Sequence, residues 1–514
     1  MKSPKKTDPP QKTPSALRER IILGMTCFLS GGAILVIELA GNRLLAPIFG
    51  NSLYTWTGLI SIILLAISLG DYLGGWMVDR NPRFILISRV LFLAAGFVFL
   101  IPAIVPWFSH NATKWSILWG PLIVAVLLFA APAILLATVT PIAIRLLSKT
   151  MGDQHIGISA GTIGMLASLG SFTGTLLAGF VLIPMIGVRE LYWVVGGLIT
   201  LLAILHLFLM RDEEKKKNIP TLAILFCVAA PLMVFFFEDA RISAIIFQKD
   251  TFYHLIRVVE KTGEANPERV LTLDNTVEGG QRFPSGEITF AYQKYWQLSE
   301  AFPNPIRRAV FFGAGAFAMP QHLSRLHPEI PVDVVEIDPE VIRVGKQFFA
   351  LGDYEKIIPH AMDARRFLSH TPDGTYDYIF GDAYHGMQYV PNHLLTQEFF
   401  ELVKSKLTPD GVYAMNFIGA LQGKKSEVFL HVLATLRSAF PEVQVYPLYP
   451  YSPEVAQNLI LVAARHPLAY RPDLSPELRN LLHNRLKDLP STDHITLLTD
   501  NYCPVEYLIA KQLQ

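Results

Sequence analysis

Cysteine is scarce in this sequence. The 514 residues include three cysteines, Cys27, Cys227 and Cys503, and two of them lie inside apolar runs. They form no Cys-x-x-Cys pair and no spacing typical of metal ligands. We therefore expect neither a disulfide framework nor a bound metal.

Charge is also scarce. Charged residues make up 17% of the chain and the formal net charge is +1, whereas 51% of the residues are hydrophobic. A nearly neutral chain lacks the general basic surface that nucleic acid requires, so we expect no nucleic-acid partner. The apolar excess is unusual for a soluble protein, and the length indicates more than one domain.

Long apolar runs fill the first 240 residues. A bilayer core of about 30 Å requires roughly 20 apolar residues per helix. Seven runs approach this length, at residues 21–41, 55–76, 85–107, 117–141, 158–184, 189–210 and 221–237. The first run is too long for a signal peptide and precedes six more. We expect a tail at 1–20 and a multi-pass α-helical domain at 21–240 with the lipid bilayer as its partner.

Basic residues near the helix ends predict the orientation in the cell (inner) membrane, because Lys and Arg are retained on the cytoplasmic side. Six lie in the tail and others follow the second, fourth and sixth runs, among them Arg80, Arg145 and Lys215. The N-terminus is therefore expected in the cytoplasm. Seven crossings would place the rest of the chain on the periplasmic or external face. If the run 221–237 is re-entrant or interfacial, the rest returns to the cytoplasm, so its side stays open.

Two carboxylates lie at membrane depth, Glu38 and Asp71. A charge in the bilayer costs at least a few kcal/mol, so both are candidates for a transport function. Structural roles are equally open, with Glu38 paired to Arg43 and Asp71 protonated or hydrogen-bonded. The stretch Gly75–Arg83 resembles the cytoplasmic loop between the second and third helices of major facilitator transporters, in agreement with the charge pattern.

The remaining residues predict a soluble α/β part. Strand-like runs at 252–260 and 269–274 and a helix at 292–302 indicate a small β-domain at 241–303. After it, strands at 309–312, 332–337, 376–380 and 411–417 alternate with helical segments. This alternation is typical of a parallel sheet covered by helices, so we expect a Rossmann-like domain at 304–514.

A Gly-rich turn follows the first of these strands. Gly313 and Gly315 would let the backbone approach a ligand at the start of the next helix. Glu336 ends the next strand about 20 residues later, where an acidic side chain can accept ribose hydroxyls. Asp363 stands where such a fold presents a carboxylate to an adenine amino group, although it could instead cap a helix. Together these residues predict an adenosine-type cofactor.

The order of residues from about Tyr253 to Pro467 resembles that of spermidine and spermine synthases, aminopropyltransferases related in fold to S-adenosylmethionine-dependent methyltransferases. The matching positions are Tyr253–His254, Leu273–Asp274, Tyr292–Gln293, Asn304–Pro305, Glu336, Asp363 and Asp382. The segments 382–396 and 498–506 resemble the membrane-fused branch of this family, which shares the helical bundle.

The resemblance implies transfer of an aminopropyl group from decarboxylated S-adenosylmethionine to a polyamine or another amine, with Asp382 as the general base. The implied donor-binding residues are His254, Gln293, Gly313, Gly315, Glu336 and Asp363. The candidate acceptor-binding residues are Tyr292, Tyr384 and His385. Aromatic side chains such as these tyrosines can flank a cationic amine.

Two departures from the family bear on the substrates. The soluble enzymes carry acidic residues where this chain has Ala316 and His385. We therefore expect an acceptor other than putrescine, or weak activity. His385 and His393 could act as a base or bind the acceptor near neutral pH, but loop histidines without an identifiable partner more often face solvent or form hydrogen bonds.

Two other functions stay open. One is methyl transfer from intact S-adenosylmethionine. The other is transport of a polyamine or metabolite, with the soluble part as a non-catalytic nucleotide sensor. The sequence does not disclose the acceptor or the oligomeric state, and a homodimer is compatible with it.

Overall fold

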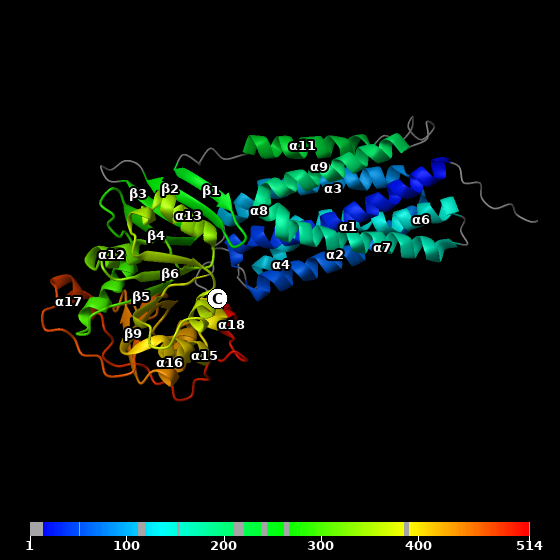
Figure 1. Ribbon diagram of the computed structural model, residues 1–514. Helices are drawn as coiled ribbons and strands as arrows, with labels where there is room; N and C mark the ends of the chain where they lie inside the picture. Colours follow the sequence, from blue (N-terminus) through cyan, green and yellow to red (C-terminus); the bar gives the residue numbers. More distant parts are fainter. Residues whose placement is uncertain are drawn as a thin grey trace, which may run out of the picture. The chain divides into compact units, whose positions relative to one another are not determined.

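The computed structural model describes residues 14–50, 52–110, 119–151, 155–209, 220–237, 244–261, 267–274, 276–384 and 390–512. The chain divides into two compact units, Met1–Ala240 and Arg241–Gln514. The labelled elements of the first unit are all helices, and both sheets belong to the second (Figure 1).

The described residues of the first unit include six helical segments that are long and apolar enough to cross a bilayer. They are α1 (Pro14–Phe49), α2 (Leu53–Arg80), α3 (Ile85–His110), the run of α4 (Gly120–Ala125), η2 (Val126–Ala130), α5 (Ala131–Ala137) and α6 (Val139–Met151), the run of α7 (Ile156–Leu177), η4 (Ala178–Leu182) and α8 (Ile183–Ile186), and α9 (Val188–Leu209). The predicted series of long apolar helices is confirmed. The seventh predicted run also forms a helix, α11 (Thr221–Phe237), but its 17 residues span only about 25 Å.

The two candidate membrane carboxylates differ in exposure. Glu38 is half-buried on α1, whereas Asp71 is exposed on α2. Both positions are compatible with purely structural roles for these carboxylates. The helical unit therefore does not by itself favour a transport function.

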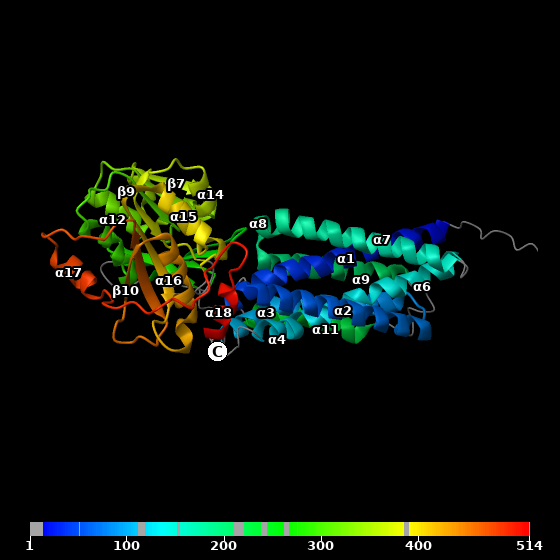
Figure 2. The same cartoon turned by 90° about the horizontal axis from the view of Figure 1, so that it is seen from below.

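Small residues allow α1 and α7 to pack closely, as both views suggest (Figures 1 and 2). A Cβ atom added to Gly170 of α7 would lie 1.8 Å from the carbonyl oxygen of Phe28 on α1. A Cβ atom added to Gly31 of α1 would lie 2.4 Å from the carbonyl oxygen of Ala167. Close backbone approach through small residues is a common basis of helix association in membranes.

Gly170→Ala should therefore destabilise the helical unit by about 1–3 kcal/mol, because the added methyl group overpacks the α1–α7 contact. Gly164→Ala is the matched control on the same helix, since its Cβ atom would meet nothing within 4 Å. Thermal unfolding of the detergent-solubilised protein should show a lower midpoint for the first variant only. Equal midpoints would contradict the close packing.

The second unit begins with a four-stranded antiparallel sheet in the order β1 (Ile245–Asp250), β2 (Leu255–Lys261), β3 (Glu268–Leu273) and β4 (Thr276–Arg282). The two predicted strands correspond to β2 and β3, whereas β1 and β4 were not predicted. The pair Gly279–Gly280 lies inside β4, and glycine is depleted in strands, so the sequence pattern conceals it. The predicted helix at 292–302 is a 3₁₀ helix, η5 (Ala291–Ala301).

A seven-stranded sheet follows, in the order β10-β11-β9-β8-β5-β6-β7. Its strands are β5 (Ala309–Phe312), β6 (Val332–Glu336), β7 (Ile357–Ala361), β8 (Tyr376–Gly381), β9 (Leu407–Gly419), β10 (Glu442–Pro447) and β11 (Gln457–Ala464). Strands β5 to β9 are parallel, and β11 pairs antiparallel with β9 and β10. The predicted Rossmann-like fold is confirmed.

Helices cover both faces of this sheet (Figure 1). One face packs against η5, α12 (Ala318–Leu326), α13 (Pro339–Phe348) and α17 (Pro476–His483), and the other against α14 (Ala364–Ser369), α15 (Gln397–Lys406), α16 (Glu427–Ala439) and α18 (Val505–Gln512). Alternate residues of β5 serve the two faces: Phe311 packs in the first core and Phe312 in the second.

The strand order reverses direction at β5. From β5 the chain proceeds to β6 and β7 on one side, then returns to β8 and β9 on the other. In open α/β sheets, ligands bind beyond the carboxyl ends of the strands at such a switch point. The carboxyl ends of β5 and β8 are therefore where a site is expected.

Candidate active site

The Gly-rich turn after β5 lies directly against the segment that follows β8. Gly313 has φ +84°, and a Cβ atom there would lie 2.3 Å from the carbonyl oxygen of Asp382. Gly315 has φ +48°, and its Cβ atom would lie 2.8 Å from the carbonyl oxygen of Glu278 on β4. Both conformation and space thus require glycine at these two positions.

Glu336, the last residue of β6, is buried and holds the turn. Its Oε2 accepts a hydrogen bond from the amide of Ala314 at 3.0 Å, and its Oε1 accepts one from the amide of Asp338 at 3.0 Å. Burial raises the pKa of Glu336, and the two amide hydrogen bonds only partly oppose this effect. Asp338 caps α13 by accepting from the amide of Glu340 at 2.9 Å.

Asp363 follows β7 and caps α14, accepting from the amide of Arg366 at 2.9 Å. The helix-capping alternative is thus present in the structure. Its Oδ2 also lies 2.7 Å from Nε2 of His393, so this loop histidine is hydrogen-bonded, one of the two structural roles expected for it. Burial alone would raise the pKa of Asp363, but the hydrogen bonds from His393 and Arg366 outweigh it and lower the pKa.

His254 precedes β2 and approaches the site from the small sheet. Its Nδ1 lies 3.2 Å from Oδ2 of Asp274. Burial alone would lower the pKa of His254, but the hydrogen bond with Asp274 and the charges of Asp274, Glu336 and Asp338 raise it. The charge of Glu336 therefore acts on His254, and both residues were predicted to bind the donor.

Asp382 stands immediately after β8 and is half-buried. Its amide donates to the carbonyl of Phe312 at 2.8 Å, and its Oδ1 accepts from Nδ2 of Asn416 at 2.8 Å. Asn416 is held in turn, because its Oδ1 accepts from Nδ2 of Asn458 at 3.0 Å. Burial raises the pKa of Asp382 to about 8, and the charge of Glu278 adds to this, while hydrogen bonds from Asn416 and Tyr292 oppose it.

Polar and aromatic groups surround Asp382. The hydroxyl of Tyr384 donates to the carbonyl of Asn416 at 3.0 Å, and the hydroxyl of Tyr292 donates to the carbonyl of Glu278 at 3.3 Å. Nε2 of Gln293 donates to the same carbonyl at 3.4 Å, while its buried Oε1 has no partner in the described part of the chain. An orphaned buried acceptor of this kind is costly unless a ligand donates to it.

The structure thus places most of the predicted residues at one edge of the sheet. Asp382, Tyr292 and Tyr384 share electrostatic contacts, and Gly313, Gly315 and Glu336 form the adjoining turn. Asp363 follows the neighbouring strand. His385 lies in 385–389, outside the described residues.

Sequence reasoning missed two residues of the site, Glu278 and Asn416. Burial raises the pKa of Glu278 to about 7, and its charge acts on Asp382. An amide inside the apolar strand Ala414–Phe417 was a usable signal for Asn416, because buried polar side chains require partners. Glu278 had no comparable signal, since a charged residue in a strand usually faces solvent.

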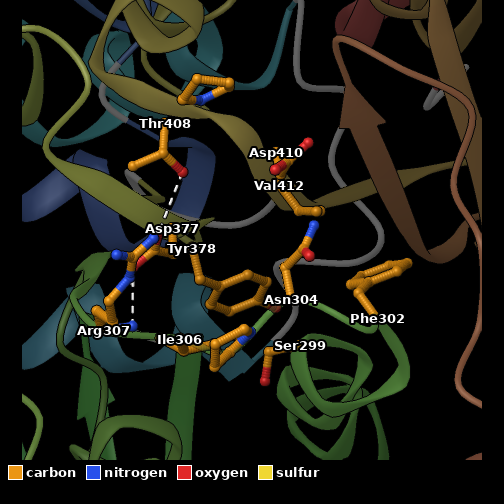
Figure 3. A pocket seen from close by; sticks show the side chains of 12 residues that line it. Ser299, Phe302, Asn304, Ile306, Arg307, Asp377, Tyr378, Thr408, Asp410 and Val412 are labelled. Carbon is orange, nitrogen blue, oxygen red and sulfur yellow. Dashed lines mark hydrogen bonds and ion pairs between the residues drawn. The ribbon is translucent and has the colours of Figure 1, made fainter.

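A cavity of about 110 Å³ lies at the opposite, amino-terminal edge of the sheet (Figure 3). Its central carboxylate, Asp377, accepts from the amide of Arg307 at 2.8 Å and from the hydroxyl of Thr408 at 3.0 Å. Along β8 this carboxylate is roughly 16 Å from Asp382. Asp377 therefore ties strand ends together, and the cavity is separate from the candidate active site.

No group of three His, Cys, Asp or Glu side chains within the described residues is arranged to hold a metal ion. The site presents the half-buried carboxyl of Asp382 beside the Gly-rich turn.

Comparison with known proteins identifies one domain and several similar proteins. Residues 318–468 match the spermine/spermidine synthase domain. The polyamine aminopropyltransferase of Vibrio vulnificus is 26% identical over 290 residues, which cover 52% of this chain and 92% of that protein. Polyamine aminopropyltransferase 2 of Aquifex aeolicus is 22% identical over 469 residues, 87% of this chain and 88% of that protein.

A methyltransferase is similar over a shorter region. The human eEF1A lysine and N-terminal methyltransferase is 30% identical over 165 residues, 30% of this chain and 22% of that protein. Two of the matches cover more than four fifths of this chain, and both are to polyamine aminopropyltransferases: the Aquifex aeolicus protein and polyamine aminopropyltransferase 2 of Streptomyces coelicolor, which is 26% identical over 461 residues, 83% of this chain and 80% of that protein. The chain therefore carries a spermine/spermidine synthase domain at residues 318–468 and is similar over most of its length to polyamine aminopropyltransferases.

Proposed function

We propose that this protein is an integral-membrane aminopropyltransferase that transfers the aminopropyl group of decarboxylated S-adenosylmethionine to a polyamine or another amine. The observation that carries the proposal is the position of Asp382. Its carboxyl group is held by Asn416 at the carboxyl end of β8, beside the Gly-rich turn and between two tyrosines. This is the edge of the sheet at which a nucleotide donor binds.

The reaction needs one carboxylate base. The lone pair of the acceptor nitrogen attacks the propyl carbon bonded to the sulfonium, a C–N bond forms, and the C–S bond breaks. The bonding electrons stay on sulfur, which leaves as the neutral thioether methylthioadenosine. Asp382 accepts the proton that the nitrogen loses, and a raised pKa suits this role at neutral to alkaline pH.

The donor-binding role rests on the residues around the turn. Gly313 and Gly315 admit the donor close to the backbone, Glu336 lies where ribose hydroxyls are bound, and Asp363 lies where adenine is bound. The orphaned Oε1 of Gln293 can accept from the donor. The pKa of His254 is raised by Asp274 and by the charges of Glu336 and Asp338, against the effect of burial.

The acceptor is proposed to lie between Tyr292 and Tyr384, both of which interact electrostatically with Asp382. Aromatic faces stabilise cationic amines. Purified protein incubated with decarboxylated S-adenosylmethionine and a panel of diamines and polyamines should release methylthioadenosine. Release with none of these amines would count against the proposal.

The rate should depend on the ionisation of Asp382. Because the carboxylate is the active form, kcat/KM should rise with pH and level off above the pKa, which is about 8 in the free enzyme. Asn416→Leu removes a hydrogen bond that lowers this pKa, so its profile should shift to higher pH. Steady-state rates between pH 6 and roughly 10 measure both midpoints; a shift to lower pH in the variant would contradict the assignment.

Methyl transfer is the second candidate, because the human eEF1A lysine and N-terminal methyltransferase is 30% identical to this chain over 165 residues. The two reactions differ in their products. Intact S-adenosylmethionine would yield S-adenosylhomocysteine in a methyl transfer, whereas aminopropyl transfer yields methylthioadenosine. Mass spectrometry of the nucleotide products assigns the reaction directly.

The membrane location is part of the proposal and rests on the six long apolar helices. With a cytoplasmic N-terminus, the side of the soluble unit follows from α11. If α11 is counted as a crossing helix, the soluble unit lies on the external face. A cysteine introduced near Arg241 should then react with an impermeant reagent in intact cells; reaction only after permeabilisation would place the unit in the cytoplasm.

A further inference from the structure

The active site contains a second acidic side chain besides Asp382. Glu278 is half-buried on β4, a strand of the small sheet, whereas Asp382 belongs to the large sheet. The charge of Glu278 acts on Asp382, and both charges act on the hydroxyl of Tyr292. The small sheet and the segment after β8 of the large sheet therefore each contribute one carboxyl group to the candidate active site.

Glu278 lies on the side of the site that the Gly-rich turn forms. A Cβ atom on Gly315 of the turn would lie 2.8 Å from the Glu278 carbonyl oxygen, and one on Gly279 would lie 3.2 Å from the amide nitrogen of Ala316. The strand segment Glu278–Gly279 therefore packs directly on the Gly-rich turn. The hydroxyl of Tyr292 and the amide of Gln293 fix it further through the same carbonyl oxygen.

The basic side chain that acts on this pair is His254, whose charge opposes the effect of burial on the pKa of Glu278. Among the described residues, no lysine or arginine forms an ion pair with Glu278 or Asp382. The hydroxyl of Thr276 donates to Oε1 of Glu278. Two carboxyl groups that are half-buried without a paired cation favour a cationic ligand between them.

The proposed donor supplies such a cation. Its primary ammonium group lies three carbons from the sulfonium, on the carbon that carries an additional carboxylate in intact S-adenosylmethionine. A carboxylate at this point of the site would attract the first molecule and repel the second.

We propose that Glu278 binds the primary ammonium of the transferred aminopropyl group and selects the decarboxylated donor over intact S-adenosylmethionine. This inference rests on the proposed aminopropyl transfer. It also accounts for Ala316: the turn contributes no carboxylate, and the neighbouring strand contributes one in its place. Glu278 is a specificity-determining residue, while Asp382, fixed by Asn416, remains the base.

The test is a set of binding measurements on the full-length protein by calorimetry, with decarboxylated S-adenosylmethionine, S-adenosylmethionine and methylthioadenosine. Glu278→Gln should weaken binding of the decarboxylated donor by about 10- to 100-fold, as expected for loss of a charge-assisted hydrogen bond, and should reduce its preference over S-adenosylmethionine. Binding of methylthioadenosine, which lacks the aminopropyl group, should not change, so this ligand also reports that the variant is folded.

The matched control is Glu287→Gln, an exposed carboxylate shortly after β4 that lies 3.9 Å from Arg282. It should leave all three affinities unchanged. If Glu278→Gln keeps the wild-type preference for the decarboxylated donor, the role of Glu278 is wrong while the proposed function stands. If the wild-type protein does not bind the decarboxylated donor, both are wrong.

Discussion

Asp382→Asn should lower kcat for methylthioadenosine release by about 10²- to 10⁴-fold, the usual contribution of a general base. The change keeps the shape of the side chain and its contact with Asn416, but removes the group that accepts the proton from the acceptor nitrogen. Binding of methylthioadenosine should be unchanged, because Asp382 contacts the turn through its backbone carbonyl and not through its carboxyl. Rates at saturating donor and amine, together with methylthioadenosine affinity, separate the two effects.

Asp373→Asn is the control for this prediction. Asp373 precedes β8 and is exposed, and its carboxylate pairs with Lys406 at 2.6 Å. Lys406 is buried, so loss of its partner should lower stability. Asp373 precedes the amino-terminal end of β8 whereas Asp382 follows its carboxyl end, so the folded variant should retain wild-type kcat. An Asp382→Asn variant with the kcat of Asp373→Asn would exclude Asp382 as the base.

Gly313→Ala should reduce kcat/KM by about 10²-fold or more, because a displacement of about 1 Å in an active site can have this effect. The new Cβ atom would lie 2.3 Å from the carbonyl oxygen of Asp382, so the turn and the segment carrying the base must move apart. The φ angle of +84° adds backbone strain for alanine. Both the donor turn and the base are therefore displaced by one methyl group.

Gly374→Ala separates strain from displacement. Gly374 also has a positive φ, +65°, but its Cβ atom would meet nothing within 4 Å. Both variants should lose stability in thermal unfolding, and only Gly313→Ala should lose activity at temperatures where both are folded. Comparable losses of activity in the two variants would show that the close contact with Asp382 has no catalytic importance.

The sequence was most informative where one physical requirement dominates. Length and apolarity predicted the helical unit, because a bilayer imposes both. The sequence could not decide whether α11 crosses a bilayer, since 17 apolar residues are close to the shortest length that can span one. The strands β1 and β4 were missed because pairing partners, not local pattern, stabilise them, and β4 contains the unfavourable pair Gly279–Gly280.

The residues of the site also divide into those that the sequence could predict and those that it could not. Asp382 and Glu336 were predictable because each lies at the carboxyl end of a predicted strand, and the carboxyl ends of parallel strands lie at one edge. Asp363 follows β7, which was not among the predicted strands, so its prediction rested on its place in such a fold. Glu278 was not predictable, because its place beside Asp382 depends on how the small sheet packs on the Gly-rich turn. Asn416 offered a signal as an amide in an apolar strand, but the side chain that it orients was not evident from the sequence. Neither relationship is local in sequence.

The central claim is aminopropyl transfer with Asp382 as the base, and product analysis tests it most directly. Purified wild-type protein and Asp382→Asn are incubated with decarboxylated S-adenosylmethionine and the amine panel, and the nucleotide and amine products are measured by mass spectrometry. The account predicts equal amounts of methylthioadenosine and aminopropylated amine from the wild-type protein and very little of either from the variant. Absence of both products from the wild-type protein with every amine, or equal yields from the two proteins, would contradict it.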